Sequence, residues 1–128
     1  MTTDDGRGGH HLKLKAQLFC GTEIAMGPGK AALLDAIAAT GSISAAGRRL
    51  GMSYRRAWLL VDVMNRCWET PLVETAAGGS HGGGARVTTL GAEILAAYRR
   101  LEEAIEAAGM DASELLFEKL APKPRPAR

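Results

Sequence analysis

The chain has 128 residues, of which 46% are hydrophobic and 23% charged, and its formal net charge is +2 at pH 7. This length favours one domain with a modest core, and so weak a net charge gives no signal for nucleic acid by itself. No apolar run is long enough to span a bilayer, and residues 1–11 lack the apolar core of a signal peptide. We therefore expect a cytoplasmic protein with no membrane partner.

Cysteine and histidine give no sign of a metal site. Cys20 and Cys67 are too few and too far apart in sequence to indicate a disulfide framework, and neither is part of a CxxC pair. They complete no metal-ligand spacing with the three histidines. We expect no metal and no cofactor.

The first part of the chain predicts a leader, a short hairpin and a helix. Residues 1–11 are expected to form a flexible leader. Apolar and polar residues alternate over 12–18, which predicts a strand, and 23–25 can return beside it after a turn at 21–22. Pro28 suits the first turn of a helix that continues through 30–39, and Gly41 is placed to end it.

Two further helices are expected on either side of Gly51. Ser42 can cap a helix from Ile43 to about Leu50, and Ser53 can cap the next one. The inner face of that third helix is predicted from an i, i+3, i+4, i+7 series, formed by Ala57, Leu60, Val61 and Met64. Trp58 is expected to pack against the first helix, or against the wing, which is the hairpin expected from the strands at 71–74 and 85–88, rather than to contact nucleic acid.

The charge is unevenly distributed. Residues 43–66 contain five arginines and one acid, whereas residues 89–108 contain two arginines and four glutamates. A basic segment beside an acidic one is the pattern expected when one face meets phosphate and another meets protein. The alternative is a pair of solvated, arginine-rich helices.

The second half predicts a hairpin and a long helix. Residues 71–74 and 85–88 are expected as strands around a glycine-rich tip at 76–84. Thr88 or Thr89 can cap a helix that ends before Gly109, so 89–108 is the expected dimerisation helix. Its apolar stripe, at steps of three and four, suits a partner helix and contains Leu90, Ile94, Tyr98, Leu101 and Ile105.

These elements together predict the fold. Strand, three helices, strand, wing, strand and long helix make a winged helix-turn-helix, an α+β fold that is mainly α. We expect this domain over 12–108. Residues 109–128 are expected to add a short helical segment within 111–120 and a disordered tail rich in proline and basic residues.

The start of the third helix is the predicted DNA-binding site. The cap at Ser53 leaves N–H groups for a phosphate, and Tyr54 can meet a phosphate, a sugar or a thymine methyl group. Arg55 and Arg56 can read guanine, although one of them more readily binds phosphate because adjacent helical positions point about 100° apart. The remaining candidates are backbone contacts from the preceding helix and minor-groove contacts from the wing, namely Ser42, Ser44, His81 and Arg86.

Simpler interpretations of these residues stay open. Arg55 and Arg56 can be exposed residues in surface ion pairs, and a solvent-exposed loop residue is the simpler interpretation of His81. Gly27–Lys30 superficially resembles a phosphate-binding loop, but Ile24 stands where that motif needs glycine and Ala31 where it needs Ser or Thr. We therefore do not expect an enzyme.

Several motifs carry a family resemblance over roughly residues 12 to 108. Residues 41–46, 51–58, 78–84 and 87–91 resemble the N-terminal DNA-binding domain of the ModE family. These are molybdate-responsive bacterial transcription regulators whose domain is related to the LysR-type winged helix. The resemblance implies a homodimer, formed partly through the long C-terminal helix, that reads a palindromic operator in double-stranded DNA.

One departure from the family matters. Members with a full sensor carry C-terminal molybdate-binding domains of OB-like fold, and this chain ends soon after the DNA-binding domain. We therefore expect a ModE-like regulator without the molybdate-binding domain, with a separate sensor protein or a full-length regulator as a possible partner. The alternative is a dimeric adaptor that modulates a full-length regulator without binding DNA itself.

Overall fold

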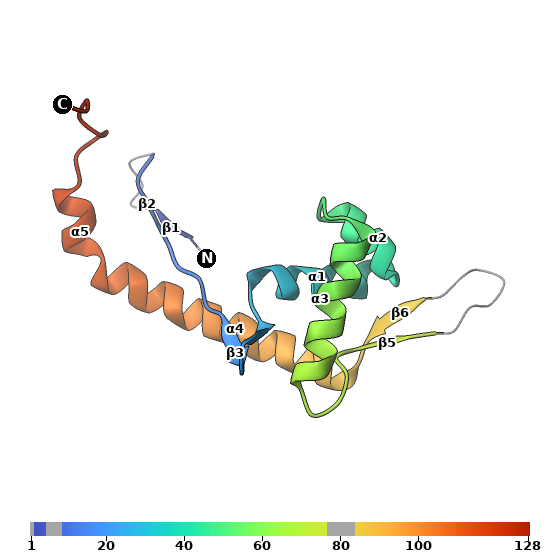
Figure 1. Ribbon diagram of the computed structural model, residues 1–128. Coiled ribbons are helices and arrows are strands. Elements are labelled where there is room, and N and C mark those ends of the chain that lie inside the picture. The colour runs from blue at the N-terminus through green and yellow to red at the C-terminus, as the bar shows by residue number, and fades with distance from the viewer. Residues whose placement is uncertain (1, 5–8, 77–83) are drawn as a thin grey trace. The chain divides into compact units, whose positions relative to one another are not determined.

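A computed structural model describes residues 2–4, 9–76 and 84–128 (Figure 1). The chain divides into two compact units, one formed by Ala16–Tyr98 and the other by Met1–Lys15 together with Arg99–Arg128. Among the described residues, no helix is both long and apolar enough to cross a membrane.

The unit Ala16–Tyr98 contains a three-helix core and two hairpins. A short antiparallel pair comes first, and a second antiparallel pair follows the three helices and leads into a long helix. This order is the winged helix-turn-helix topology that the sequence predicts. The elements are β3 (Leu18–Cys20), β4 (Glu23–Met26), α1 (Pro28–Thr40), α2 (Ile43–Arg49), α3 (Tyr54–Cys67), β5 (Val73–Thr75), β6 (Ala85–Val87) and the beginning of α4 (Thr89–Ala112).

Local sequence signals set the helix boundaries as predicted. Gly41 adopts φ 70° and its N–H donates to the carbonyl of Ile37 at 2.8 Å, which ends α1. The Ser42 hydroxyl accepts from the N–H of Ala45 at 3.1 Å. The Ser53 hydroxyl caps α3 in the same way, accepting from the N–H of Arg56 at 3.1 Å.

The tight turn between α2 and α3 depends on two glycines. Gly51 has φ 70°, a conformation that glycine adopts without strain. At Gly47 a Cβ atom would lie 3.1 Å from the Cβ of Ala57, so the missing side chain allows α2 and α3 to approach closely.

The core of this unit lies between α1, α3 and the two hairpins. The predicted inner face of α3 is confirmed for Ala57, Val61 and Met64, whereas Leu60 is only partly buried. The largest fully buried side chains come from β4, α1, α3 and the loop before β5, and are Met26, Leu33, Leu34, Ile37, Met64 and Leu72. Burial of this apolar surface is the main favourable contribution to folding.

The expectation of one strand over 12–18 is wrong. Two separate strands occupy this region: β2 (His11–Lys13) pairs with β1 (Thr2–Asp4), and β3 pairs with β4. Alternation predicts an extended chain but cannot say which neighbour it pairs with. The strand β1 also means that Thr2–Asp4 do not belong to a structureless leader; residues 1 and 5–8 lie outside the described part.

The second unit shows that α4 does not end before Gly109. The helix runs to Ala112, because a glycine inside a helix costs only about 1 kcal/mol relative to alanine. A Cβ atom at position 109 would lie 2.6 Å from Cδ1 of Leu14, so the glycine makes room for that side chain.

After α4, a short helix and an irregular tail complete the second unit. The helical segment expected within 111–120 is confirmed as α5 (Glu114–Lys119). Residues 121–128 have no helix or strand. The backbone carbonyl of Pro122 lies 3.2 Å from Nε2 of His10, which attaches the start of the tail to the N-terminal segment.

Candidate nucleic-acid interface

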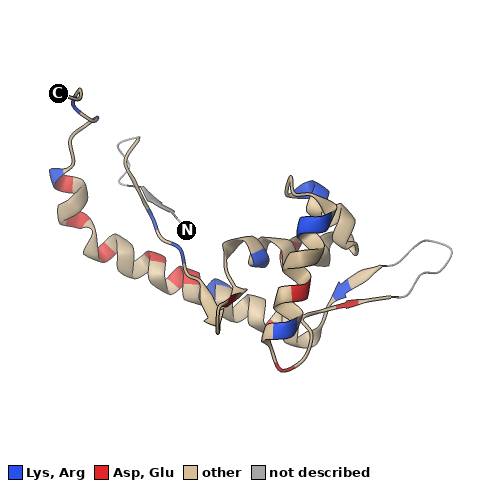
Figure 2. Ribbon diagram, in the orientation of Figure 1, with Lys and Arg blue, Asp and Glu red and all other residues tan. Residues whose placement is uncertain are grey.

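The first turn of α3 presents two cationic side chains to solvent. Arg55 and Arg56 are both exposed, and within the described ranges neither is recorded in an ion pair. Arg48 and Arg49, in the last turn of α2, are exposed as well. Figure 2 shows basic residues on α2 and near the start of α3, while acidic residues are frequent along α4 and α5. Arg55 and Arg56 are therefore accessible to a ligand, as the predicted DNA-binding site requires.

A groove lies beside these arginines, between the helix-turn-helix and the wing. Its volume is about 310 Å³, and its lining includes Ser42, Ser44, Tyr54, Trp58, Thr75 and Ala85. The Ser44 hydroxyl accepts a hydrogen bond from Arg48 at 3.1 Å, which holds that guanidinium along α2. Ser42 and Ser44, which are predicted to contact the DNA backbone, thus line the same groove as the aromatic side chains of α3.

Trp58 lies in this groove and not in the core. Its ring packs edge-to-face against that of Tyr54, with centroids 6.1 Å apart and planes at 71°. Residues of both wing strands line the groove with it, as expected, yet 38% of Trp58 stays exposed. This exposure leaves the indole available to a ligand.

The wing carries one described candidate. Arg86 on β6 donates to the carboxylate of Glu74 on β5 at 2.6 Å, and both side chains are largely exposed. Such a surface pair contributes about 1 kcal/mol or less, so it can be exchanged for another anion. The other candidate on the wing, His81, lies outside the described residues.

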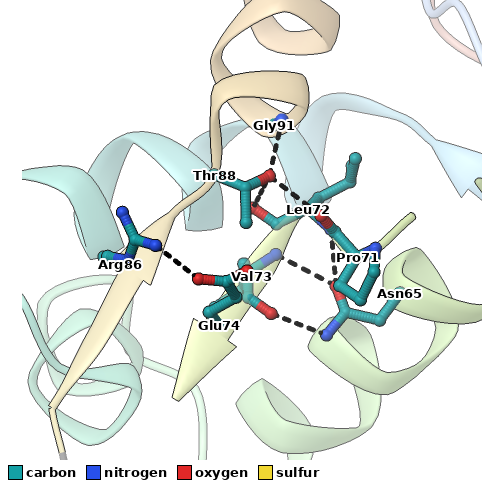
Figure 3. A network of polar contacts seen from close by, with 8 residues as sticks. All are labelled: Asn65, Pro71, Leu72, Val73, Glu74, Arg86, Thr88 and Gly91. Atoms are coloured by element: carbon teal, nitrogen blue, oxygen red, sulfur yellow. Dashed lines mark hydrogen bonds and ion pairs between the residues drawn. The ribbon is translucent and has the colours of Figure 1, made fainter. Parts of the chain in front are cut away.

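A partly buried amide, that of Asn65, joins α3 to the wing, and the sequence analysis did not identify it. The side-chain oxygen of Asn65 accepts from the N–H groups of Leu72 and Val73, at 2.9 and 3.1 Å, and its NH₂ donates to the Val73 carbonyl at 3.0 Å (Figure 3). The only signal in the sequence is an asparagine in the last turns of a helix, shortly before a strand. These bonds fix where β5 starts relative to α3.

Thr88 extends this network to α4. Its hydroxyl donates to the Pro71 carbonyl at 2.8 Å and accepts from the N–H of Gly91 at 3.0 Å (Figure 3). Thr88 is therefore the cap of α4, one of the two residues that the sequence allows. The start of α4, the wing and α3 form one hydrogen-bonded assembly.

Three ionisable groups around α3 have shifted pKa values. Burial lowers the pKa of Lys30 on α1, and the nearby guanidinium of Arg56 adds to that shift. The hydrogen bond from Arg66 to Asp62, 2.9 Å long, raises the pKa of the arginine. Burial raises the pKa of Cys67, and the neighbouring Cys20 thiol raises it further. Burial therefore disfavours the charged forms of Lys30 and Cys67, whereas the hydrogen bond to Asp62 favours the charged form of Arg66.

The apolar stripe of α4 divides between the core and solvent. Leu90 and Ile94 pack against the core of the unit Ala16–Tyr98. Tyr98 is only 5% exposed, and its hydroxyl donates to the carbonyl of Ala16 at 2.7 Å. Leu101, by contrast, is 47% exposed, and Ile105 is partly buried. Tyr98 therefore offers little surface to a partner subunit. The solvent-exposed part of the stripe, which we call the free part of α4, begins at Leu101.

The helix-turn-helix, with its second helix exposed and a two-stranded wing beside it, defines the winged helix-turn-helix class. The structure is similar to the crystal structure of a CbnR_DBD–DNA complex, with a TM-score of 0.53, 23% sequence identity, and coverage of 69% of this chain and 95% of that one. At this identity the likeness shows the fold. No family model matches the chain.

Several sequence relatives match the chain at higher identity than this structure does. The chain is 43% identical over 102 residues to the molybdenum-pterin-binding protein MopB of Rhodobacter capsulatus, a match that covers 80% of this chain and 36% of the relative. It is 46% identical over 71 residues to the molybdenum transport protein ModE of Herbaspirillum seropedicae, a match that covers 56% of this chain and 26% of that relative. It is 39% identical over 92 residues to the DNA-binding transcriptional dual regulator ModE of Escherichia coli K12, and this match covers 72% of this chain and 33% of that relative.

Over the matched residues the chain is homologous to proteins named ModE, MopA and MopB, at 39–48% identity. It spans about a third or less of the length of the curated relatives that it matches.

Proposed function

We propose that this chain binds double-stranded DNA as a transcription regulator, with the first turn of α3 in the major groove. The observation that carries the proposal is the exposure of Arg55 and Arg56 at the N-terminus of the second helix of a helix-turn-helix. The names of the ModE relatives, which describe transcriptional regulators, and the CbnR_DBD–DNA complex support it.

Five of the candidate residues have distinct roles in this proposal. The two arginines point about 100° apart, so one can bind guanine through two hydrogen bonds while the other binds a phosphate. Ser42 and Ser44 face the DNA backbone beside the groove. Arg86 can exchange its exposed pair with Glu74 for a phosphate near the minor groove.

The proposal extends to the assembly and to its target genes. Two copies that meet through α4 would place two α3 helices on the half-sites of a palindromic operator. The names of the relatives refer to molybdenum transport and molybdenum-pterin binding, which favours target genes that respond to molybdenum. In this proposal the protein acts in the cytoplasm without catalysis, and a separate sensor or a full-length regulator supplies the signal.

The proposal is tested by titrating duplex DNA, selected from a randomised pool, with the purified chain and its variants. Arg55→Ala and Arg56→Ala should each weaken binding about tenfold, within the range of about 1–3 kcal/mol for one good contact to a base. Their free energy of unfolding should change by less than about 0.5 kcal/mol, since both residues are exposed.

The matched control is Arg100→Ala, which removes another exposed arginine, on α4, and should leave DNA binding unchanged. Affinity should also fall steeply with salt, because phosphate contacts release counterions. If both α3 variants bind as the wild type does, the proposed site is wrong. If no duplex binds in a salt-dependent manner, the protein is better explained as an adaptor.

A second experiment tests the link to molybdenum. Genomic fragments bound by the chain would be mapped from cells grown with and without molybdate. The expected result is enrichment of promoters for molybdenum transport or molybdoenzyme genes, and enrichment of unrelated promoters under both conditions would contradict this part of the proposal.

A further inference from the structure

The exposed face of α3 is apolar as well as basic. Tyr54, Trp58 and Leu59 are 61%, 38% and 53% exposed, and we call these three residues the apolar strip. Tyr54 and Trp58 are one helical turn apart and in edge-to-face contact, and Leu59 follows Trp58 directly. Leu59 points about 100° away from Trp58, so the strip covers two adjoining faces of the same helical turns. Single exposed apolar residues are ordinary, but several large ones within two helical turns indicate a contact surface.

The surroundings of the strip restrict what it can contact. The exposed cations Arg55 and Arg56 lie on the same two helical turns, and the hydroxyl groups of Ser42 and Ser44 line the groove that Tyr54 and Trp58 share. A protein partner would have to supply carboxylates for the cations and apolar groups for the strip. Duplex DNA supplies both, because its phosphates are anionic and its major groove presents the C5-methyl group of thymine.

The positions on the helix suggest which bases are read together. Arg55 and Leu59 are four residues apart and therefore lie on one face of α3. One helical turn rises 5.4 Å, and successive bases on one strand are about 3.4 Å apart, so the two side chains can reach bases one or two steps apart.

We propose that Trp58 and Leu59, assisted by Tyr54, are specificity residues that recognise thymine through its methyl group, one or two steps from the guanine that Arg55 reads. This inference rests on the proposed function, because it assigns a further contact of the same interface. It adds Trp58 and Leu59 to the residues that read the operator, and it makes a thymine methyl part of the recognised sequence.

The experiment removes a single methyl group from the DNA. The 128-residue chain would first select its preferred site from a randomised duplex pool, and each thymine of that site would then be replaced in turn by deoxyuridine. Base pairing and hydrogen bonds are unchanged by this replacement. At one or two positions near a guanine the affinity should fall about fourfold, the factor expected for losing the burial of one methyl-sized group.

Variants then connect this loss to the strip. With Leu59→Ala or Trp58→Ala, thymine and deoxyuridine at that position should bind equally well, while the salt dependence of binding should match that of the wild type. The control is Leu115→Ala, which removes an even more exposed leucine from α5 and should keep the fourfold difference. A variant that merely unfolded would lose the salt-dependent binding too, which thermal melting would reveal.

The outcomes separate this inference from the proposed function. If every deoxyuridine site binds as tightly as its thymine counterpart while Arg55→Ala still weakens binding, the inference is overturned and the proposed function stands. If the fourfold difference persists in both strip variants, other residues read the methyl group and the inference is again overturned. If no duplex is selected at all, both fail together.

Discussion

The helix α4 contains two glycines, and the regions around them differ in how firmly they are packed. A Cβ atom at Gly91 would overlap the backbone oxygen of Leu72, whereas one at Gly109 would lie 2.6 Å from the tip of the Leu14 side chain. Backbone cannot move without disturbing the wing, but the end of a leucine can rotate away. The first part of α4 is thus built into a rigid core, and the second part belongs to a unit with room to adjust.

The largest expected effect separates these two glycines. Gly91→Ala should lower the free energy of unfolding by about 3 kcal/mol, because the new methyl group overlaps backbone. Gly109→Ala should change it by less than about 1 kcal/mol, since the gain in helix propensity offsets the displacement of Leu14. Urea unfolding of both variants measures the difference, and equal losses would show that the two regions are packed alike.

An intermediate effect is expected at Tyr98, the last residue of the rigid part. Tyr98→Phe removes the hydroxyl that donates to the Ala16 carbonyl, and should cost about 1 kcal/mol of unfolding free energy. Tyr54→Phe is the matched control, because its ring is 61% exposed and its stability should not change. If Tyr98→Phe leaves the free energy of unfolding unchanged, the rigid core ends before Tyr98 in α4.

The smallest effect on stability is expected one turn later, at Leu101. Leu101→Ala should change the free energy of unfolding by less than about 0.5 kcal/mol, because this side chain is 47% exposed. If two copies associate through the free part of α4, sedimentation velocity should show a weaker dimer than that of the wild type. A dimer of unchanged strength would exclude Leu101 from the contact between subunits.

Sequence signals that act over a few residues predicted the structure well. The caps at Ser42 and Ser53 and the end of α1 at Gly41 follow from hydrogen bonds and backbone conformations that involve only neighbouring residues. The exposed arginines of α3 followed from the same reasoning, because three of the four residues predicted for its inner face are buried.

Features that depend on distant parts of the chain were not predictable in the same way. The stripe on α4 has a single period, yet Tyr98 is buried against Ala16 while Leu101 is exposed, and only tertiary packing distinguishes the two. A glycine that ends a helix and one that admits a side chain look the same in sequence, which is why Gly109 was misassigned. The role of Asn65 depends on the backbone of β5, and no local pattern reveals it.

The hydrogen bonds of the Asn65 amide bear on how this domain would respond to the shape of bound DNA. Because it ties the end of α3 to the first strand of the hairpin, those two elements cannot shift independently to suit different ligands. A double helix would then have to conform to a preset separation between adjacent grooves, at an energy that depends on how readily its own sequence deforms. Discrimination between sites could accordingly arise at base pairs that no side chain touches.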